Sequence, residues 1–294
     1  LVIEEKPGVL RRQTVELLLR FADWCEKYGI GLVLNMHKAI GNYCDIEEKV
    51  GLLDDEGLKQ RFIAVWERLE EIFHDRPAVV FELLNEVRNV DPELWNDLAE
   101  KTITAIRKKS LTRQIVVGGV CGNAAWALGQ LRVFDEENVI STFHCYDPYG
   151  FTHQQGVLQP PPMFYNRKMP WPGDIERYRD FERVAMGKED PLPEYTVMDR
   201  RYIEDTMKPA FKFMEKNPDK ILWCGEFGTI RHCPIEWREN WTADVISILK
   251  EHSIPYCVWN YLSTPNDGNR FSLVDDDTRK ILSPRMAKII RGEV

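Results

Sequence analysis

The chain has 294 residues, of which 44% are hydrophobic and 29% are charged. These values suit one large globular domain covering 1–294, and a single α/β barrel commonly has this length. The formal net charge of −8 comes from acidic residues spread along the chain, which argues against nucleic acid and anionic membranes as partners. No apolar run reaches the ~18 residues that a membrane-spanning helix needs, so we expect no membrane partner.

The cysteine content favours a reducing compartment. Seven cysteines are an odd number, and several fall in or beside predicted core strands, where a free thiol behaves as a small hydrophobic side chain. No cysteine or histidine spacing is typical of a structural zinc site, and we predict neither a metal nor a cofactor. The first residues lack the layout of a signal peptide. Both a cytoplasmic and a secreted location stay open, and the oligomeric state is not indicated.

The hydrophobic periodicity predicts helices and strands in alternation along the chain. An amphipathic helix near 10–28 closes at Gly29, and the pair Asp91-Pro92 is suited to begin the helix near 92–109. The other predicted helices lie near 57–74, 124–132, 199–217, 236–252 and 284–291. The predicted strands lie at 30–36, 78–85, 114–119, 138–146, 220–226 and 255–261.

The predicted strands are apolar on both sides, which indicates a parallel sheet covered by helices. Successive strand ends mostly recur about every 30 residues, as in a barrel of eight strand–helix units. The interval from Tyr146 to Glu226 is longer, and the segment 150–198 within it is rich in proline and aromatic residues. We interpret this segment as an insertion that forms a structured flap over the barrel mouth. Only six strands are found, although a closed barrel needs eight.

Polar side chains stand at the carboxyl ends of these strands. Two apolar strands each deliver a glutamate, Glu86 after Asn85 and Glu226 before a glycine turn. A buried carboxylate without a partner is costly, and two glutamates on parallel strands are the groups that a glycosidase requires. The other candidates at strand ends are His37, Asn123, His144, Tyr146 and Trp259.

Five stretches, taken in order, resemble the cellulase family of glycoside hydrolases, family five. They cover nearly the whole chain, and the first and third are most similar to clostridial cellulase C-type endoglucanases, which also carry an insertion after strand six. The stretches are Leu34-Asn-Met-His37-Lys-Ala, Phe81-Glu-Leu-Leu-Asn85-Glu86, His144-Cys-Tyr146-Asp-Pro-Tyr-Gly-Phe-Thr-His153-Gln, Cys224-Gly-Glu226-Phe-Gly and Val258-Trp259-Asn-Tyr.

The resemblance implies a retaining endo-β-1,4-glucanase that acts on a β-linked polysaccharide or oligosaccharide. It assigns Glu86 as the acid/base and Glu226 as the nucleophile, with carboxyls about 5–5.5 Å apart, as retention requires. Glu86 must then keep a proton near neutral pH while Glu226 stays ionised. Tyr146 is expected to donate a hydrogen bond to Glu226, with His144 beside the pair.

Four further residues receive substrate-binding roles from the same resemblance. Asn85 is expected to bind the sugar 2-hydroxyl, a contact that strengthens in the transition state. His37 is expected to bind another hydroxyl of that sugar, and Trp259 to lie under its ring. Asn123 is a further candidate for a sugar contact.

The resemblance also implies a (β/α)8 TIM barrel that lacks the first two strands and carries an insertion after strand six. The family's arginine at the end of strand two, a donor to the nucleophile, would be absent with them. The exposed edges of an open barrel invite pairing with another chain. We therefore expect this chain to be either poorly active or part of a longer enzyme.

Other interpretations stay open. The barrel could be a β-mannanase or a mixed-linkage or β-1,3-glucanase, a non-catalytic carbohydrate binder, or a metal-dependent hydrolase using His37, His144 and a glutamate. Each histidine or aromatic could instead be a core residue. The acidic run 275–277 is predicted as a solvated turn, with calcium as the alternative. Further aromatic candidates for sugar stacking are Tyr43, Trp126, Tyr149 and Trp171.

Overall fold

The computed structural model describes residues 3–42, 51–264 and 267–293. The backbone divides into two compact units. The first comprises Leu1–Thr142 with Asn217–Ile221, and the second comprises Phe143–Lys216 with Leu222–Val294. In the part of the chain that the structure describes, no helix combines the length and apolarity needed to cross a bilayer.

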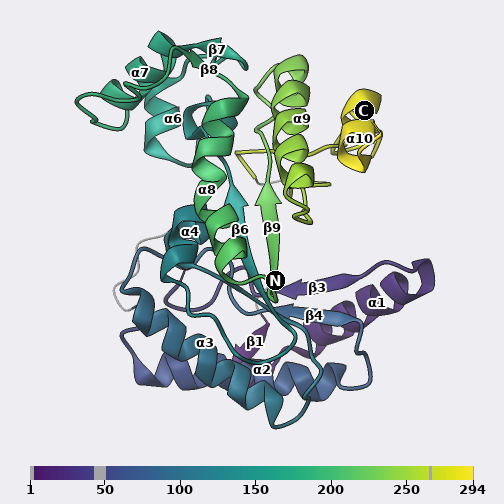
Figure 1. The fold of residues 1–294 in the computed structure, drawn as a ribbon. Coiled ribbons are helices and arrows are strands. Elements are labelled where there is room, and N and C mark those ends of the chain that lie inside the picture. The colour runs from purple at the N-terminus through teal and green to yellow at the C-terminus, as the bar shows by residue number, and fades with distance from the viewer. Residues whose placement is uncertain (1–2, 43–50, 265–266, 294) are drawn as a thin grey trace. The chain divides into compact units, whose positions relative to one another are not determined.

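The first unit alternates helices with parallel strands, as the periodicity predicts (Figure 1). Its strands pair in the order β3-β4-β5-β6, and every pairing among them is parallel. β3 stands at the end of this order. The strands are β3 (Leu32–Asn35), β4 (Val79–Glu82), β5 (Ile115–Gly118) and the first part of β6 (Val139–Cys145). The helices are α1 (Arg12–Tyr28), α2 (Glu56–Phe73), α3 (Pro92–Arg107), α4 (Val120–Asn123) and the 3-10 helix η1 (Ala125–Gln130).

Local sequence signals explain where these helices begin and end. The side chain of Asp91 accepts the N–H of Glu93 at the start of α3, and Asp55 does the same for Leu58 in α2. α1 closes at Gly29 in the left-handed conformation (φ 64°). The predicted start of α3 at Asp91-Pro92 and the predicted end of α1 at Gly29 are confirmed.

Two local features of the first unit differ from what the sequence led us to expect. The helix expected near 124–132 is a 3-10 helix, and it follows a kinked turn in which Cys121 and Gly122 have positive φ. A small antiparallel pair of strands that was not predicted, β1 (Glu4–Lys6) and β2 (Val9–Leu10), precedes α1.

Buried indole groups fix the carboxyl ends of β4 and β5. Trp66 donates its N–H to Leu83 O at 3.2 Å, and Trp95 donates to Gly118 O at 2.8 Å. Both indoles are buried. Because a buried indole N–H needs a partner, these two bonds join the covering helices to the strand ends at which the candidate site residues begin.

The second unit begins inside β6, which neighbours β9 (Ile221–Phe227). Helix α9 (Ile235–Glu251) packs against α8 (Arg200–Lys216) and α10 (Pro284–Arg291) (Figure 1). The predicted insertion is structured along most of its length. It contains α5 (Tyr149–Thr152), α6 (Pro160–Tyr165), β7 (Gly173–Asp174), α7 (Ile175–Val184) and β8 (Val197–Met198).

The strand predicted at 255–261 is wrong as a continuous strand. Only one isolated parallel bridge forms there, between Cys224 and Tyr256. The N–H of Cys257 bonds to Cys224 O, and the N–H of Trp259 bonds to Phe227 O. Between these two hydrogen bonds the segment runs two residues, from Cys257 to Trp259, whereas β9 runs three, from Cys224 to Phe227. The extra residue in β9 interrupts the regular ladder. The backbone still runs beside β9 as far as Trp259.

Candidate active site

In the first unit, Asn85 and Glu86 follow the end of β4. Leu83 and Leu84, which precede this pair, and Val87, which follows it, are all buried. The N–H of Asn85 donates to Met36 O at 3.0 Å, which ties this turn to the end of β3. Glu86 is half-buried and has a left-handed backbone (φ 45°). Non-glycine residues adopt this conformation at a cost of about 1–3 kcal/mol, and such strain clusters at functional sites.

The side-chain amide of Asn85 is buried without a protein partner. Asn85 is 2% exposed, and its Nδ2 has no hydrogen-bond partner among the described residues. A buried amide that lacks a partner typically costs about 1–3 kcal/mol. Its two N–H donors are therefore available to a ligand hydroxyl, which is the chemistry predicted for this position.

Asn123 lies against the carboxyl end of β5. It is fully buried and has a left-handed backbone (φ 57°). A Cβ at Gly118 would come within 2.4 Å of Asn123 Oδ1, so only glycine allows this approach. The structure places Asn123 at the expected strand end, but in close packing.

His37 follows β3 and is exposed. It lines a cavity of about 510 Å³ whose other walls include residues of β1, β3, α1 and α2. The walls are mainly apolar, with one ion pair between Arg61 and Glu4 at 2.7 Å. Neither Asn85 nor Glu86 is among the described residues that line it. The cavity therefore does not join His37 to the other predicted residues of this unit.

In the second unit, β6 and β9 bring three of the predicted residues together. Tyr146 donates its hydroxyl to Glu226 Oε2 at 2.8 Å, so the predicted hydrogen bond is present. His144 Nδ1 lies 3.5 Å from the same oxygen. A phenol that donates to a carboxylate favours its ionised form. The hydrogen bond from Tyr146 therefore holds the carboxylate of Glu226 in one orientation.

Trp259 lies beside the turn that follows Glu226. Its N–H bonds to Phe227 O at 2.8 Å. A Cβ at Gly228 would come within 2.1 Å of Trp259 O. Glycine at 228 is thus needed for the close approach of these two backbone segments, and it brings the Trp259 backbone to the carboxyl end of β9.

Aromatic packing around Tyr146 was not anticipated from the sequence. The ring of His153 lies 5.2 Å from that of Tyr146 and 5.3 Å from that of Phe271. Thr152 donates its hydroxyl to Tyr146 O at 2.6 Å. His153 belongs to a stretch that carries the family resemblance, which was an available signal. Phe271 offered none, because it lies in an irregular loop.

A half-buried acid, Asp147, follows directly after Tyr146. Burial, reinforced by the Glu182 carboxylate and partly opposed by Lys188, raises the pKa of Asp147 to about 6. Its backbone carbonyl accepts the indole N–H of Trp241 at 3.0 Å. Asp147 thus belongs to the support of the site rather than to its solvated surface.

The remaining aromatic candidates separate by exposure. Trp171 is 1% exposed and donates its indole N–H to Asp244, so it is a packing residue. Trp126 is 55% exposed and Tyr149 is half-buried, and both keep an accessible ring surface. Tyr43 lies outside the described residues.

Comparisons with known proteins agree on one family. The family model described as cellulase (glycosyl hydrolase family 5) matches residues 3–264. The chain is similar to endoglucanase C of Acetivibrio thermocellus, with 32% identity over 98% of this chain and 82% of the relative. It is also similar to cellodextrinase A of Ruminococcus flavefaciens, with 27% identity over 86% of this chain and 69% of the relative.

Solved structures show the same fold at lower identity. An endoglucanase from the hyperthermophilic Thermotoga maritima has a TM-score of 0.76 and 22% identity, covering 98% of this chain and 81% of that one. A cellulose synthase subunit from Clostridioides difficile has a TM-score of 0.75 and 18% identity, covering 98% and 84%.

Proposed function

We propose a function from one established premise: the chain belongs to the cellulase family, glycosyl hydrolase family 5. On this basis the protein is a retaining endo-β-1,4-glucanase that hydrolyses β-glucan chains by double displacement. The single observation that supports this most directly is the hydrogen bond from Tyr146 to Glu226 at 2.8 Å. It orients a carboxylate and keeps it ionised at the end of a strand, as a glycosidase nucleophile requires.

Glu226 is the proposed nucleophile. In the first step its carboxylate attacks the anomeric carbon and forms a covalent glycosyl–enzyme intermediate, while the leaving group departs. Tyr146 holds the reacting carboxylate in position. His144, 3.5 Å from the same oxygen, adds positive charge to this environment when it is protonated.

Glu86 is the proposed acid/base. It protonates the glycosidic oxygen in the first step and then removes a proton from the water that hydrolyses the intermediate. Glu86 follows an apolar run that ends in the buried Leu84, and the buried Val87 comes after it. The acid/base role requires Glu86 to hold a proton near neutral pH. This role requires the carboxyls of Glu86 and Glu226 to stand on the two sides of one glycosidic bond.

The proposed substrate contacts follow the chemistry of each side chain. The buried Nδ2 of Asn85, without a partner among the described residues, binds the sugar 2-hydroxyl. His37 and Asn123 bind further hydroxyl groups, and Trp259 provides an apolar platform under the ring. His144 also contacts the sugar beside the nucleophile.

The finer description of the fold belongs to this proposal. The parallel α/β sheet is of the type found in this family of (β/α)8 barrels. We propose that β3, β4, β5, β6, β9 and the segment 255–259 correspond to the last six strands of such a barrel within one catalytic domain. The segment 150–198 is then an insertion after the sixth strand.

The test is hydrolysis of soluble β-1,4-glucan, mixed-linkage glucan, β-1,3-glucan and β-mannan, with reducing ends and product sizes measured. Preferred internal cleavage of β-1,4-glucan with a β-anomeric product, seen by NMR, supports the proposal. A preference for mannan or another linkage would reassign the substrate. Activity lost in a chelator would favour a metal-dependent hydrolase, and binding without cleavage would favour a carbohydrate-binding barrel.

A further inference from the structure

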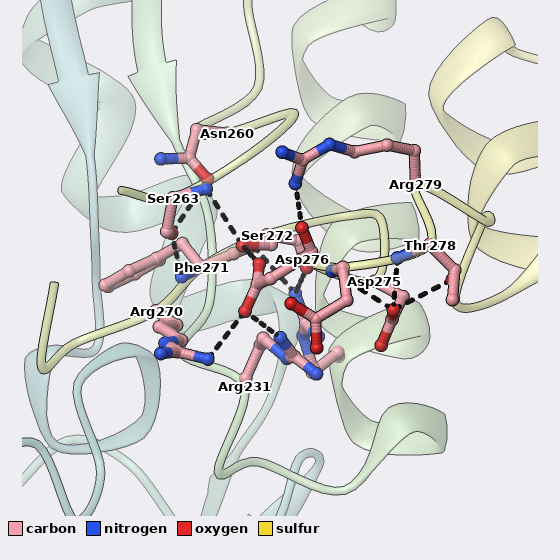
Figure 2. A network of polar contacts seen from close by, with 12 residues as sticks. Arg231, Asn260, Ser263, Arg270, Phe271, Ser272, Asp275, Asp276, Thr278 and Arg279 are labelled. Carbon is pink, nitrogen blue, oxygen red and sulfur yellow. Dashed lines mark hydrogen bonds and ion pairs between the residues drawn. The ribbon is translucent and has the colours of Figure 1, made fainter. Parts of the chain in front are cut away.

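A carboxylate remote from the proposed catalytic groups binds three donors at once. Asp276 Oδ2 accepts from Arg231 at 2.6 Å and from Arg270 at 2.7 Å. Asp276 Oδ1 accepts the hydroxyl of Ser272 at 2.8 Å. We call these four residues the Asp276 cluster. Figure 2 shows Asp276 between the two guanidinium groups, with Ser272 on its other oxygen.

Hydrogen bonds connect this cluster to the residue that follows Trp259. The hydroxyl oxygen of Ser272 accepts the N–H of Ser263 at 2.9 Å. The hydroxyl of Ser263 in turn donates to Asn260 Oδ1 at 3.3 Å (Figure 2). Both serines are buried, at 0% and 4% exposure. Because water cannot readily replace buried partners, a displacement of Asp276 would also displace Ser272, Ser263 and the loop that carries Trp259.

The same cluster also holds the loop that follows β9. Arg231 lies in that loop, and its N–H donates to Arg270 O at 2.7 Å. Nearby, the buried guanidinium of Arg238 donates to Thr229 Oγ1 at 3.1 Å and to Phe271 O at 3.1 Å. The loop after β9, which contains Thr229 and Arg231, is therefore joined to the segment that contains Phe271.

Phe271 brings this connection to the nucleophile. Its N–H donates to Ser263 Oγ at 3.1 Å. Its ring packs edge-on against Tyr146, with centroids 6.0 Å apart and an interplanar angle of 79°. Tyr146 is the residue that donates to Glu226. One loop thus carries the proposed sugar platform and also supports the donor to the proposed nucleophile.

We propose that Asp276 is a positioning residue that holds the loop of Trp259 and Phe271 against the loop that follows Glu226. It contacts no substrate and acts only through the chain of hydrogen bonds and ion pairs described above. This inference rests on the proposed function, in which Trp259 lies under a sugar and Glu226 attacks it.

The neighbours of Asp276 show that its role is specific. Asp275 instead closes the turn, since its Oδ1 accepts from both the N–H and the hydroxyl of Thr278. Asp277 is exposed. The Asp276 side chain is only 17% exposed, and the hydroxyl of Ser272, followed by the two arginines, lowers its pKa. The acidic run is a turn, as predicted, but its middle carboxylate is occupied by arginines rather than solvated.

Two substitutions separate the charge of Asp276 from its hydrogen bond. Asp276→Asn keeps an acceptor for Ser272 but loses the ionic attraction of the arginines, whereas Asp276→Ala loses both. Asp277→Ala is the matched control on the same turn. Hydrogen exchange of the full chain, read by mass spectrometry over 259–264, reports whether the loop loosens, and steady-state kinetics on cellotetraose report the consequence.

We expect Asp276→Ala to increase exchange in that segment and to lower kcat/KM ~10-fold, a coupling of the size found in contacting networks. Asp276→Asn is expected to have a smaller effect in the same direction, and Asp277→Ala to stay within ~2-fold. A Trp259→Ala/Tyr146→Phe background removes both the platform and the donor to Glu226. If Asp276 acts through the loop of Trp259 and Phe271, the loss in that background is smaller than ~2-fold.

Unchanged exchange at 259–264 in both Asp276 variants overturns the inference. So does a loss of kcat/KM that is equally large in the wild type and in the Trp259→Ala/Tyr146→Phe background, because it would indicate a general effect on folding. An inactive wild type overturns the proposed function instead. In that case hydrogen exchange alone still decides whether Asp276 holds the loop, because this measurement needs no substrate.

Discussion

The two glutamates differ in how the chain holds them. Glu226 lies in a regular strand, and a phenol and an imidazole from the neighbouring strand approach the same oxygen. Glu86 lies beyond the end of its strand on a left-handed backbone, beside the fully buried Val87. Hydrogen-bond donors favour an ionised carboxylate, whereas apolar surroundings favour a protonated one. The donor from Tyr146 suits Glu226 to the proposed role of nucleophile, and the role of acid/base that we propose for Glu86 is tested separately below.

The largest expected effect comes from removing Glu226, the proposed nucleophile. Glu226→Ala is expected to lower kcat by about 10⁴-fold or more, because no covalent intermediate can form. An activated aryl leaving group should not restore the rate, since attack itself is lost. Added azide should give a glycosyl azide of inverted configuration, measured by NMR. Turnover near the wild-type rate would exclude Glu226 as the nucleophile.

Removal of the proposed acid should have an effect that depends on the leaving group. Glu86→Ala is expected to lower kcat/KM on cellotetraose by about 10³-fold, within the range of general acid catalysis. On a dinitrophenyl cellobioside, which needs no protonation, the loss should be far smaller. Azide should accelerate the second step and give a product of retained configuration. Equal losses on both substrates would contradict the assigned role.

The unpartnered amide next to Glu86 offers a test that separates function from stability. Asn85→Ala should lower kcat/KM by about 10²-fold, because the bond to the 2-hydroxyl strengthens in the transition state. Tm should not fall, since the substitution removes a buried amide that has no partner among the described residues. A lower Tm with full activity would show that the amide serves the fold instead.

The donor to Glu226 can be removed with little change in packing. Tyr146→Phe keeps the ring but removes the hydrogen bond of 2.8 Å. A hydrogen bond to a charged group contributes about 1.5–3 kcal/mol, so kcat should fall roughly 10- to 100-fold with KM nearly constant. Tyr149→Phe, at a nearby tyrosine whose ring lies 4.6 Å from that of His153, is the matched control and should keep kcat within ~2-fold.

The smallest expected effect concerns Asp147, the half-buried acid that follows Tyr146 in the chain. Because folding raises the pKa of Asp147 to about 6, the folded state holds this proton longer than the unfolded state. Stability contributed by the protonated group is then lost as the pH rises from about 4 to about 6. Asp147→Asn should therefore stabilise the protein by about 1–2 kcal/mol at pH 7.5, measured by urea unfolding.

The gain from Asp147→Asn should vanish at pH 4, where the native carboxyl is already protonated. Asp277→Asn, on an exposed turn, should change stability little at either pH. A pH-independent gain from Asp147→Asn would show that the effect arises from packing rather than from ionisation.

Most elements of the fold could be predicted because their signals are local. The cap at Asp91, the glycine after α1 and the helical periodicity act within a few residues. The strand at 255–261 could not be predicted correctly, because its ladder fails through a mismatch with β9, which lies about 30 residues away in sequence. Strand pairing depends on a partner, so its details are not encoded in one segment.

By itself the sequence determined which polar residues end the apolar strands, and it named Glu86, Asn85, Tyr146 and Glu226 as candidates. The family resemblance also predicted the hydrogen bond from Tyr146 to Glu226, and the structure confirms it at 2.8 Å. Only the tertiary structure showed that Asp276 binds Arg231, Arg270 and Ser272 beside the loop that follows Trp259. Hydrogen bonds and ion pairs require atoms within about 3–4 Å, and such distances arise from packing between segments far apart in the chain. The periodicity of one segment carries no information about them.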